Sequence, residues 1–118
     1  MKKLLLCTIF ILPFFLIGCA YEYVPPQPDF KGKLENYDYE IYLKYDHYCN
    51  AEIKFTNNYK ENKSPTVTLT AYDSNGINID DTFYYFSDLD PGEIIVRDSA
   101  FLKIEYCSKI NKIKISIR

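Results

Sequence analysis

The feature that most constrains this chain is an alternation of apolar and polar residues that recurs in several short segments. From residue 37 to residue 45 the odd positions are Tyr, Tyr, Ile, Leu and Tyr, and the even positions are mostly charged. A period of two puts successive side chains on opposite faces of a strand. The pattern therefore predicts a strand with one buried face, and it returns at residues 49–56, 66–71 and 112–117.

Turn residues separate these segments. Residues 73–76 read Asp-Ser-Asn-Gly and residues 90–92 read Asp-Pro-Gly, both typical of turns. Further strands are expected at residues 77–79 and 82–86, with a break at Asp80-Asp81, and at residues 94–97 and 100–106. The twelve Tyr also favour sheets. The pattern predicts an all-β fold, a single small antiparallel Ig-like β-sandwich of about seven strands.

The N-terminus has the layout of an export signal. Lys2 and Lys3 precede an apolar run, Leu4 to Ile17, that Pro13 interrupts. A membrane-spanning helix needs about 20 apolar residues. The run is shorter than that, so we expect a signal peptide.

The end of this run carries a specific motif. Leu16-Ile17-Gly18-Cys19 resembles the lipobox of bacterial lipoproteins. The resemblance implies cleavage before Cys19, a thioether-linked diacylglycerol on its sulfur and acylation of the new N-terminus. We therefore expect a signal peptide at 1–18, a lipidated Cys and linker at 19–30, and the β-sandwich domain at 31–118.

The linker contains Pro25, Pro26 and Pro28. In a polyproline II conformation it would span roughly 30 Å; a merely disordered segment has the same composition. Ala20 follows the lipidated Cys, where an Asp would resemble an inner-membrane retention signal. The expected location is thus the cell envelope, at the outer membrane of a Gram-negative host or otherwise at the outer face of the plasma membrane.

The mature chain keeps one further pair of cysteines, Cys49 and Cys107. In an oxidising compartment an even pair predicts a disulfide. Cys49 shares the inward register of its strand. In a regular strand from residue 100 to 106 Cys107 would point outward, so the bridge is expected where a strand ends.

Residues 69–94 resemble a second family. Their turn and strand residues are similar to the pattern of FxLYD-type domains, Ig-like sandwiches of bacterial envelope proteins and lipoproteins. Phe55-Thr56-Asn57 resembles the end of an earlier strand in that family. The residues of the first stretch that carry the resemblance are Tyr72, Asp73, Gly76, Leu89, Pro91, Gly92 and Glu93. The resemblance implies a fold and no activity.

Composition argues against catalysis. His47 is the single imidazole, and we expect it to be solvated in a turn, not a metal ligand. The Asp-rich turn at 73 lacks the glycine and glutamate spacing of a calcium loop. Without Lys2 and Lys3 the chain has 12 basic and 16 acidic residues, a net charge of -4, which does not suit nucleic-acid binding. No catalytic residue, metal or cofactor is expected.

Tyrosine is the remaining functional indication. Residues 83–86 read Phe-Tyr-Tyr-Phe and put aromatic rings on both faces of one strand, and Tyr42 lies on the polar face of another. Exposed tyrosines are favoured at interfaces. Tyr42, Tyr84 and Phe86 are the candidate partner face; the alternative is a strand buried on both faces.

The sequence thus predicts a lipid-anchored envelope protein that acts as a structural or protein-interaction module. It would present an aromatic, acidic face to another envelope protein. One alternative is an inhibitor of a secreted enzyme such as lysozyme, because small lipoproteins that inhibit lysozyme resemble this chain at Tyr48-Cys49 and Cys107. A phage- or plasmid-type exclusion or immunity lipoprotein is another. The oligomeric state is left open.

Overall fold

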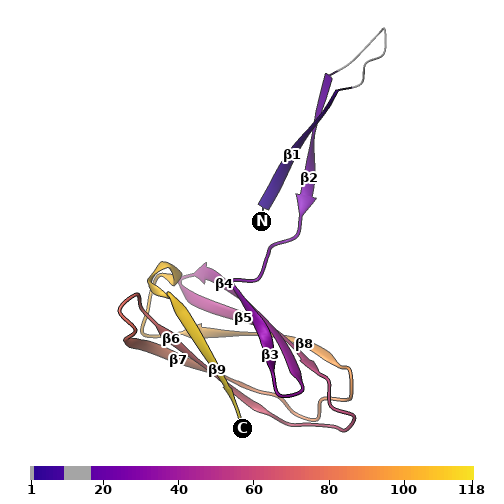
Figure 1. The fold of residues 1–118 in the computed structure, drawn as a ribbon. Helices are drawn as coiled ribbons and strands as arrows, with labels where there is room; N and C mark the ends of the chain where they lie inside the picture. The colour runs from indigo at the N-terminus through magenta and orange to yellow at the C-terminus, as the bar shows by residue number, and fades with distance from the viewer. Residues whose placement is uncertain (1, 10–16) are drawn as a thin grey trace.

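The computed structural model describes the backbone of residues 2–9 and 17–118 and the side chains of residues 24–118. Strands β1 (Lys2–Ile9) and β2 (Ile17–Val24) pair with each other in an antiparallel sheet of their own (Figure 1). Leu16 of the expected lipobox lies outside the described residues. The side chains of Ile17, Gly18 and Cys19 lie outside them too.

The rest of the chain folds into two antiparallel sheets. The four-stranded sheet has the order β3-β4-β5-β8 and the three-stranded sheet the order β7-β6-β9. The strands are β3 (Phe30–Leu34), β4 (Tyr37–Asp46), β5 (Tyr48–Asn57), β6 (Thr66–Tyr72), β7 (Asn78–Tyr85), β8 (Ile94–Phe101) and β9 (Lys112–Ile117). The predicted all-β sandwich of about seven strands is confirmed.

The strand pairing has the interlocked form of an immunoglobulin-like sandwich. β5 pairs with β8 in one sheet, and the next strand, β6, pairs with β9 in the other. Strands B with E and C with F are related in the same way in immunoglobulin domains. β4, β5, β6, β8 and β9 thus correspond to strands A, B, C, E and F, and β3 extends the edge beside β4.

The core lies between the inward faces that the alternation predicted. Ile41, Ile53 and Phe55 from the four-stranded sheet and Val67 and Leu69 from β6 are fully buried. The ring of Phe55 stacks between two others, with centroids 4.8 Å from Tyr37 and 5.0 Å from Phe86. Aromatic stacking therefore contributes to the core at this end of the sandwich.

Two strand predictions were wrong. β7 runs through the predicted break, because the Asp80 carboxylate turns inward and accepts hydrogen bonds from the N–H groups of Asp81 and Lys103. β8 is one strand that ends at Phe101, and no strand follows at 102–106. Phe101 pairs with Cys49 at the beginning of β5, so β8 has no partner beyond that point.

The two sides of the sandwich differ. On one side the edges of β7 and β8 meet, where the Thr82 hydroxyl contacts the Ser99 hydroxyl and donates to the Ala100 carbonyl. On the other side β3 and β9 are the edge strands. Among the described residues, no helix is long and apolar enough to cross a membrane.

Candidate functional site

The predicted disulfide is confirmed. Cys49 and Cys107 are bonded, with their Cα atoms 5.0 Å apart. Cys49 is buried near the beginning of β5, and Cys107 begins a short 3-10 helix, η1 (Cys107–Lys109), that leads to β9. The bridge lies beyond the end of β8, as the residue parity indicated.

The predicted partner face does not exist as a single surface. Tyr84 is 3% exposed and Phe86 4% exposed, so both belong to the core. Tyr84 even donates its hydroxyl proton to the buried Ala51 carbonyl on the opposite sheet. Tyr42 is half-buried on the outward face of the four-stranded sheet. The prediction was wrong for Tyr84 and Phe86, because the pairing of β7 with β6 fixes the opposite parity as outward.

Burial raises the pKa of the Tyr84 phenol far above its ordinary value, with smaller contributions from Asp98 and Glu52. The folded state then holds the phenolic proton more tightly than the unfolded chain does. Stability from this group is therefore complete below the unfolded pKa of about 10 and falls as the pH rises above it. We expect Tyr84→Phe to make urea stability less dependent on pH between about 10 and 11.5. An unchanged dependence would contradict this assignment, and Tyr85→Phe, an exposed neighbour, is the control.

The outward residues of β7 are the aromatic pair that the sequence prediction missed. Phe83 is 51% exposed and Tyr85 77% exposed. Alternation alone could not single them out, because aromatic residues occupy both parities of this strand. The row of threonines in β6 indicates the solvent-facing side of that strand. Phe83 pairs with Thr68 and Tyr85 pairs with Thr66, so both aromatic residues lie on the same solvent-facing side.

These residues belong to the outward surface of the three-stranded sheet, here named the β7–β6–β9 face. β6 contributes a central row of threonines, and β9 contributes cations on the far side. Cross-strand rows join Phe83 to Thr68 to Ser116, and Asp81 to Thr70 to Lys114. Neighbouring strands lie about 4.8 Å apart, so the aromatic row and the cationic row are about 10 Å apart. The members of the face are Asp81, Phe83, Tyr85, Thr66, Thr68, Thr70, Lys112, Lys114, Ser116 and Arg118.

The charge of this face is basic on β9, while Asp81 adds one carboxylate on β7. Lys112, Lys114 and Arg118 are exposed, and none has a carboxylate within 4.0 Å among the described side chains. The chain carries a net charge of -2. An uncompensated cationic row on an acidic protein attracts an acidic surface. It also argues against a strongly basic target such as lysozyme at this face.

The outward face of the four-stranded sheet is different. Its charges are paired across strands, with Lys44 2.8 Å from Glu52 and Lys54 3.8 Å from Glu40. The hydrogen bond to Glu52 raises the pKa of Lys44. The charges in such pairs compensate each other, so they are less available to a charged partner.

The hairpin between β4 and β5 contains the single histidine. His47 has φ of 64° and lies exposed in the turn, 3.8 Å from Asp46. Nearby, the exposed ring of Tyr45 stacks on Tyr106 with centroids 5.6 Å apart. Among the described residues no group of three or more His, Cys, Asp or Glu could hold a metal ion.

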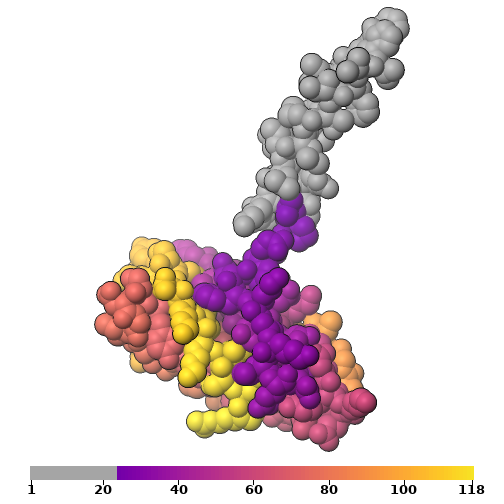
Figure 2. Space-filling view, viewed as in Figure 1, coloured from indigo at the N-terminus to yellow at the C-terminus, as the bar shows by residue number. Residues whose placement is uncertain are grey.

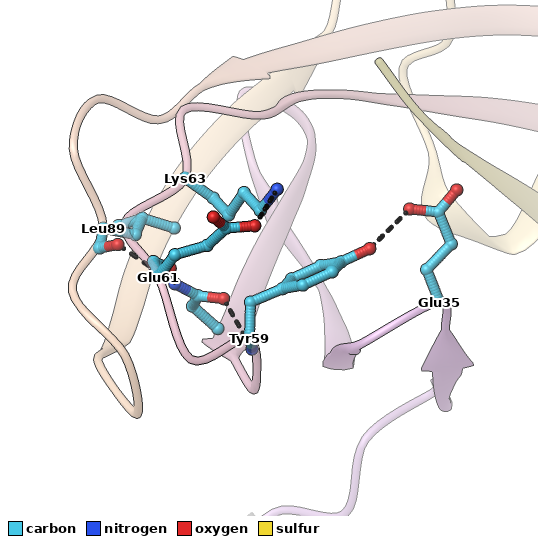
Figure 3. A network of polar contacts seen from close by, with 6 residues as sticks. Glu35, Tyr59, Glu61, Lys63 and Leu89 are labelled. Atoms are coloured by element: carbon cyan, nitrogen blue, oxygen red, sulfur yellow. Dashed lines mark hydrogen bonds and ion pairs between the residues drawn. The ribbon is translucent and has the colours of Figure 1, made fainter.

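The opposite end of the sandwich holds a polar network centred on Asn57 (Figure 3). Its side chain is fully buried and donates to the carbonyls of Glu61, Leu89 and Asp90 at 3.1, 3.0 and 3.3 Å. Its Oδ1 accepts the Tyr59 N–H at 2.9 Å. One amide thus joins the loop after β5 to the loop before β8.

The outer part of the network is charged and partly exposed. Lys63 lies 2.9 Å from Glu61 and 4.5 Å from the centre of the Tyr59 ring. The Tyr59 hydroxyl donates to Glu35 at 3.2 Å. The hydrogen bond to Glu61 raises the pKa of Lys63. These contacts all serve to fix loops, so we assign the network to stability.

Several of the residues that carry the FxLYD resemblance stabilise turns or lie in the core. Gly76 and Gly92 have φ of 76° and 78°, which β-carbon-bearing residues rarely adopt. Glu93 accepts the Asp90 N–H in the second turn, and Leu89 is buried. Comparisons with family models, with curated proteins and with solved structures found no match to the chain.

Proposed function

We propose that this protein is a lipid-anchored, non-catalytic binding module of a bacterial cell envelope, and that the β7–β6–β9 face contacts a protein partner. The observation that carries the proposal is the exposure of Phe83 and Tyr85 side by side on a regular strand. Large aromatic side chains are costly to expose and are enriched at interfaces.

The neighbouring residues support this role. Threonines on β6 contribute hydroxyl groups that can form hydrogen bonds, and the cations on β9 lie on the far side of them from β7. An interface typically places aromatic anchors beside a polar rim. The matching partner surface is apolar opposite β7 and acidic opposite β9.

The anchor part of the proposal is supported by the sequence of residues 1–19. The basic start, the short apolar run and the lipobox residues occur in the order of a lipoprotein signal. Two or more acyl chains give stable attachment without a spanning helix. A linker of three prolines before β3 would hold the sandwich away from the lipid.

A photo-crosslinking amino acid at Thr68, in the middle of the face, tests the proposal in native membranes. We expect one dominant crosslinked protein. The double change Phe83→Ser and Tyr85→Ser should lower its yield at least about tenfold, because aromatic anchors carry most of the binding energy of an interface. Mass analysis of the N-terminal peptide from the same membranes tests diacylglycerol on Cys19.

The matched control is Ile94→Ser with Val96→Ser. These residues are exposed to a similar degree, 56% and 51%, but lie on the other sheet. Their change should leave the crosslink intact. The binding proposal is refuted if both double variants behave alike, and the anchor is refuted if the Cys19 peptide carries no lipid.

A further inference from the structure

The outer edge of β9 has no strand beside it. β9 pairs with β6 alone, and no other strand of the described chain adds to this sheet beyond it. In immunoglobulin domains strand F, the counterpart of β9, lies between C and G. β9 and the other edge strand, β3, appear on the same viewed side of the molecule, in yellow and indigo (Figure 2).

The hydrogen-bonding groups on this edge can be assigned from the register. Thr66 and Arg118 exchange both backbone hydrogen bonds, at 3.1 and 2.9 Å. Antiparallel pairing alternates along a strand, so every second residue of β9 turns its N–H and C=O toward β6. The backbone groups of Ile113, Ile115 and Ile117 therefore point to the free edge.

The side chains of the same three residues are only half-buried although they face the core. On β3, across the open side, Phe30 is half-buried too. By contrast, inward residues of the central strand β5 are fully buried, such as Ile53 and Phe55. A further strand beside β9 would cover the apolar side chains and satisfy the free backbone groups at once.

Charge identifies what kind of strand would fit. The outward side chains along β9 include Lys112 and Lys114, followed by Arg118, with no carboxylate within 4.0 Å in the described part of the chain. β3 carries two more exposed cations, Lys31 and Lys33, each opposite a carboxylate of β4. Lysines on an edge strand oppose pairing with another basic strand, but they attract an acidic one.

We propose that the free edge of β9 binds an extended acidic peptide segment of a partner protein, in which apolar residues alternate with Asp or Glu. The segment adds as the next strand, with its apolar side chains over Ile113, Ile115 and Ile117 and its carboxylates beside the lysines. Strand addition to an exposed edge is a known mode of peptide recognition. This inference deepens the proposed binding role and does not depend on Phe83 or Tyr85.

The test is amide hydrogen exchange, followed by NMR on the full chain, with a ten-residue peptide of alternating Val and Glu as the probe. We expect the amides of Ile113, Ile115 and Ile117 to exchange at least about tenfold more slowly with the peptide bound. A peptide of alternating Val and Lys is the matched control and should give no protection.

Three variants make the result specific. Ile115→Pro removes an N–H that points to the free edge, which an edge strand tolerates, and should abolish the protection. Val96→Pro makes the same change in β8 and should leave the protection intact. The charge reversal Lys112→Glu with Lys114→Glu should weaken peptide binding about tenfold in a chain that still folds.

The inference is overturned if neither peptide protects the three amides, if both protect them equally, or if protection appears on β8. Lys112 and Lys114 would then serve only to prevent other strands from pairing with the edge of β9. A chain carrying Phe83→Ser and Tyr85→Ser should still bind the acidic peptide. Failure at the β9 edge and failure of the aromatic interface can therefore be told apart.

Discussion

Replacing Asn57 with alanine is expected to lower the free energy of unfolding by about 3 kcal/mol or more. The change removes three donated hydrogen bonds and the acceptor of the Tyr59 N–H. The Leu89 carbonyl, which Asn57 contacts in a buried position, would keep only the Lys63 N–H as a donor. The Tyr59 N–H would lose its side-chain acceptor, and a polar group left without a partner costs more than its hydrogen bond contributes.

Urea unfolding followed by circular dichroism measures the effect. The neighbouring Asn58→Ala is the matched control. Its side chain is exposed and bonds the Asp38 carboxylate at 2.7 Å on the surface, so we expect a loss below about 1 kcal/mol. Equal losses for the two variants would show that burial of the Asn57 amide is unimportant.

Removal of the Cys49–Cys107 bridge is expected to be comparably severe. The two residues are separated by 58 positions. A cross-link over a loop of that length restricts the unfolded chain and contributes about 4 kcal/mol in the chain-entropy estimate. Reduction should therefore bring an immunoglobulin-like domain of this size close to the limit of stability.

The measurement is the urea midpoint with and without dithiothreitol. The double variant Cys49→Ala and Cys107→Ala should match the reduced protein and no longer respond to the reductant. A midpoint that reduction leaves unchanged would contradict the assigned role of the bridge. The slope of the transition distinguishes a change in stability from a change in the unfolded state.

Much of the fold could be predicted because alternation is a local property. The strands β4, β5, β6 and β9 follow directly from it, and the parity of Cys107 placed the bridge beyond a strand end. Turn residues also marked their positions correctly, since Gly76 and Gly92 both adopt positive φ. In each case the deciding residues lie within a few positions of one another.

The errors arise where pairing with a neighbouring strand determines which side chains face outward and where a strand ends. Residues 82–86 have plausible core residues in both parities, and the pairing of Thr68 with Phe83 settles which is outward. Likewise, β8 ends because β5 begins opposite Phe101, which no local pattern reveals. The outward positions at 83–86 were therefore assigned to Tyr84 and Phe86, which are buried, and not to Phe83 and Tyr85.

The position of the disulfide has a consequence for fluctuations of the native state. β9 is held by β6 alone, so it has fewer interstrand contacts to lose than a central strand has. Cys107 lies shortly before Lys112 and is fixed to the beginning of β5. When β9 detaches from β6, the disulfide at Cys107 keeps the strand close to its native position. Its return is then an intramolecular step at high effective concentration. The edge can thus open and close repeatedly while the rest of the sandwich stays folded.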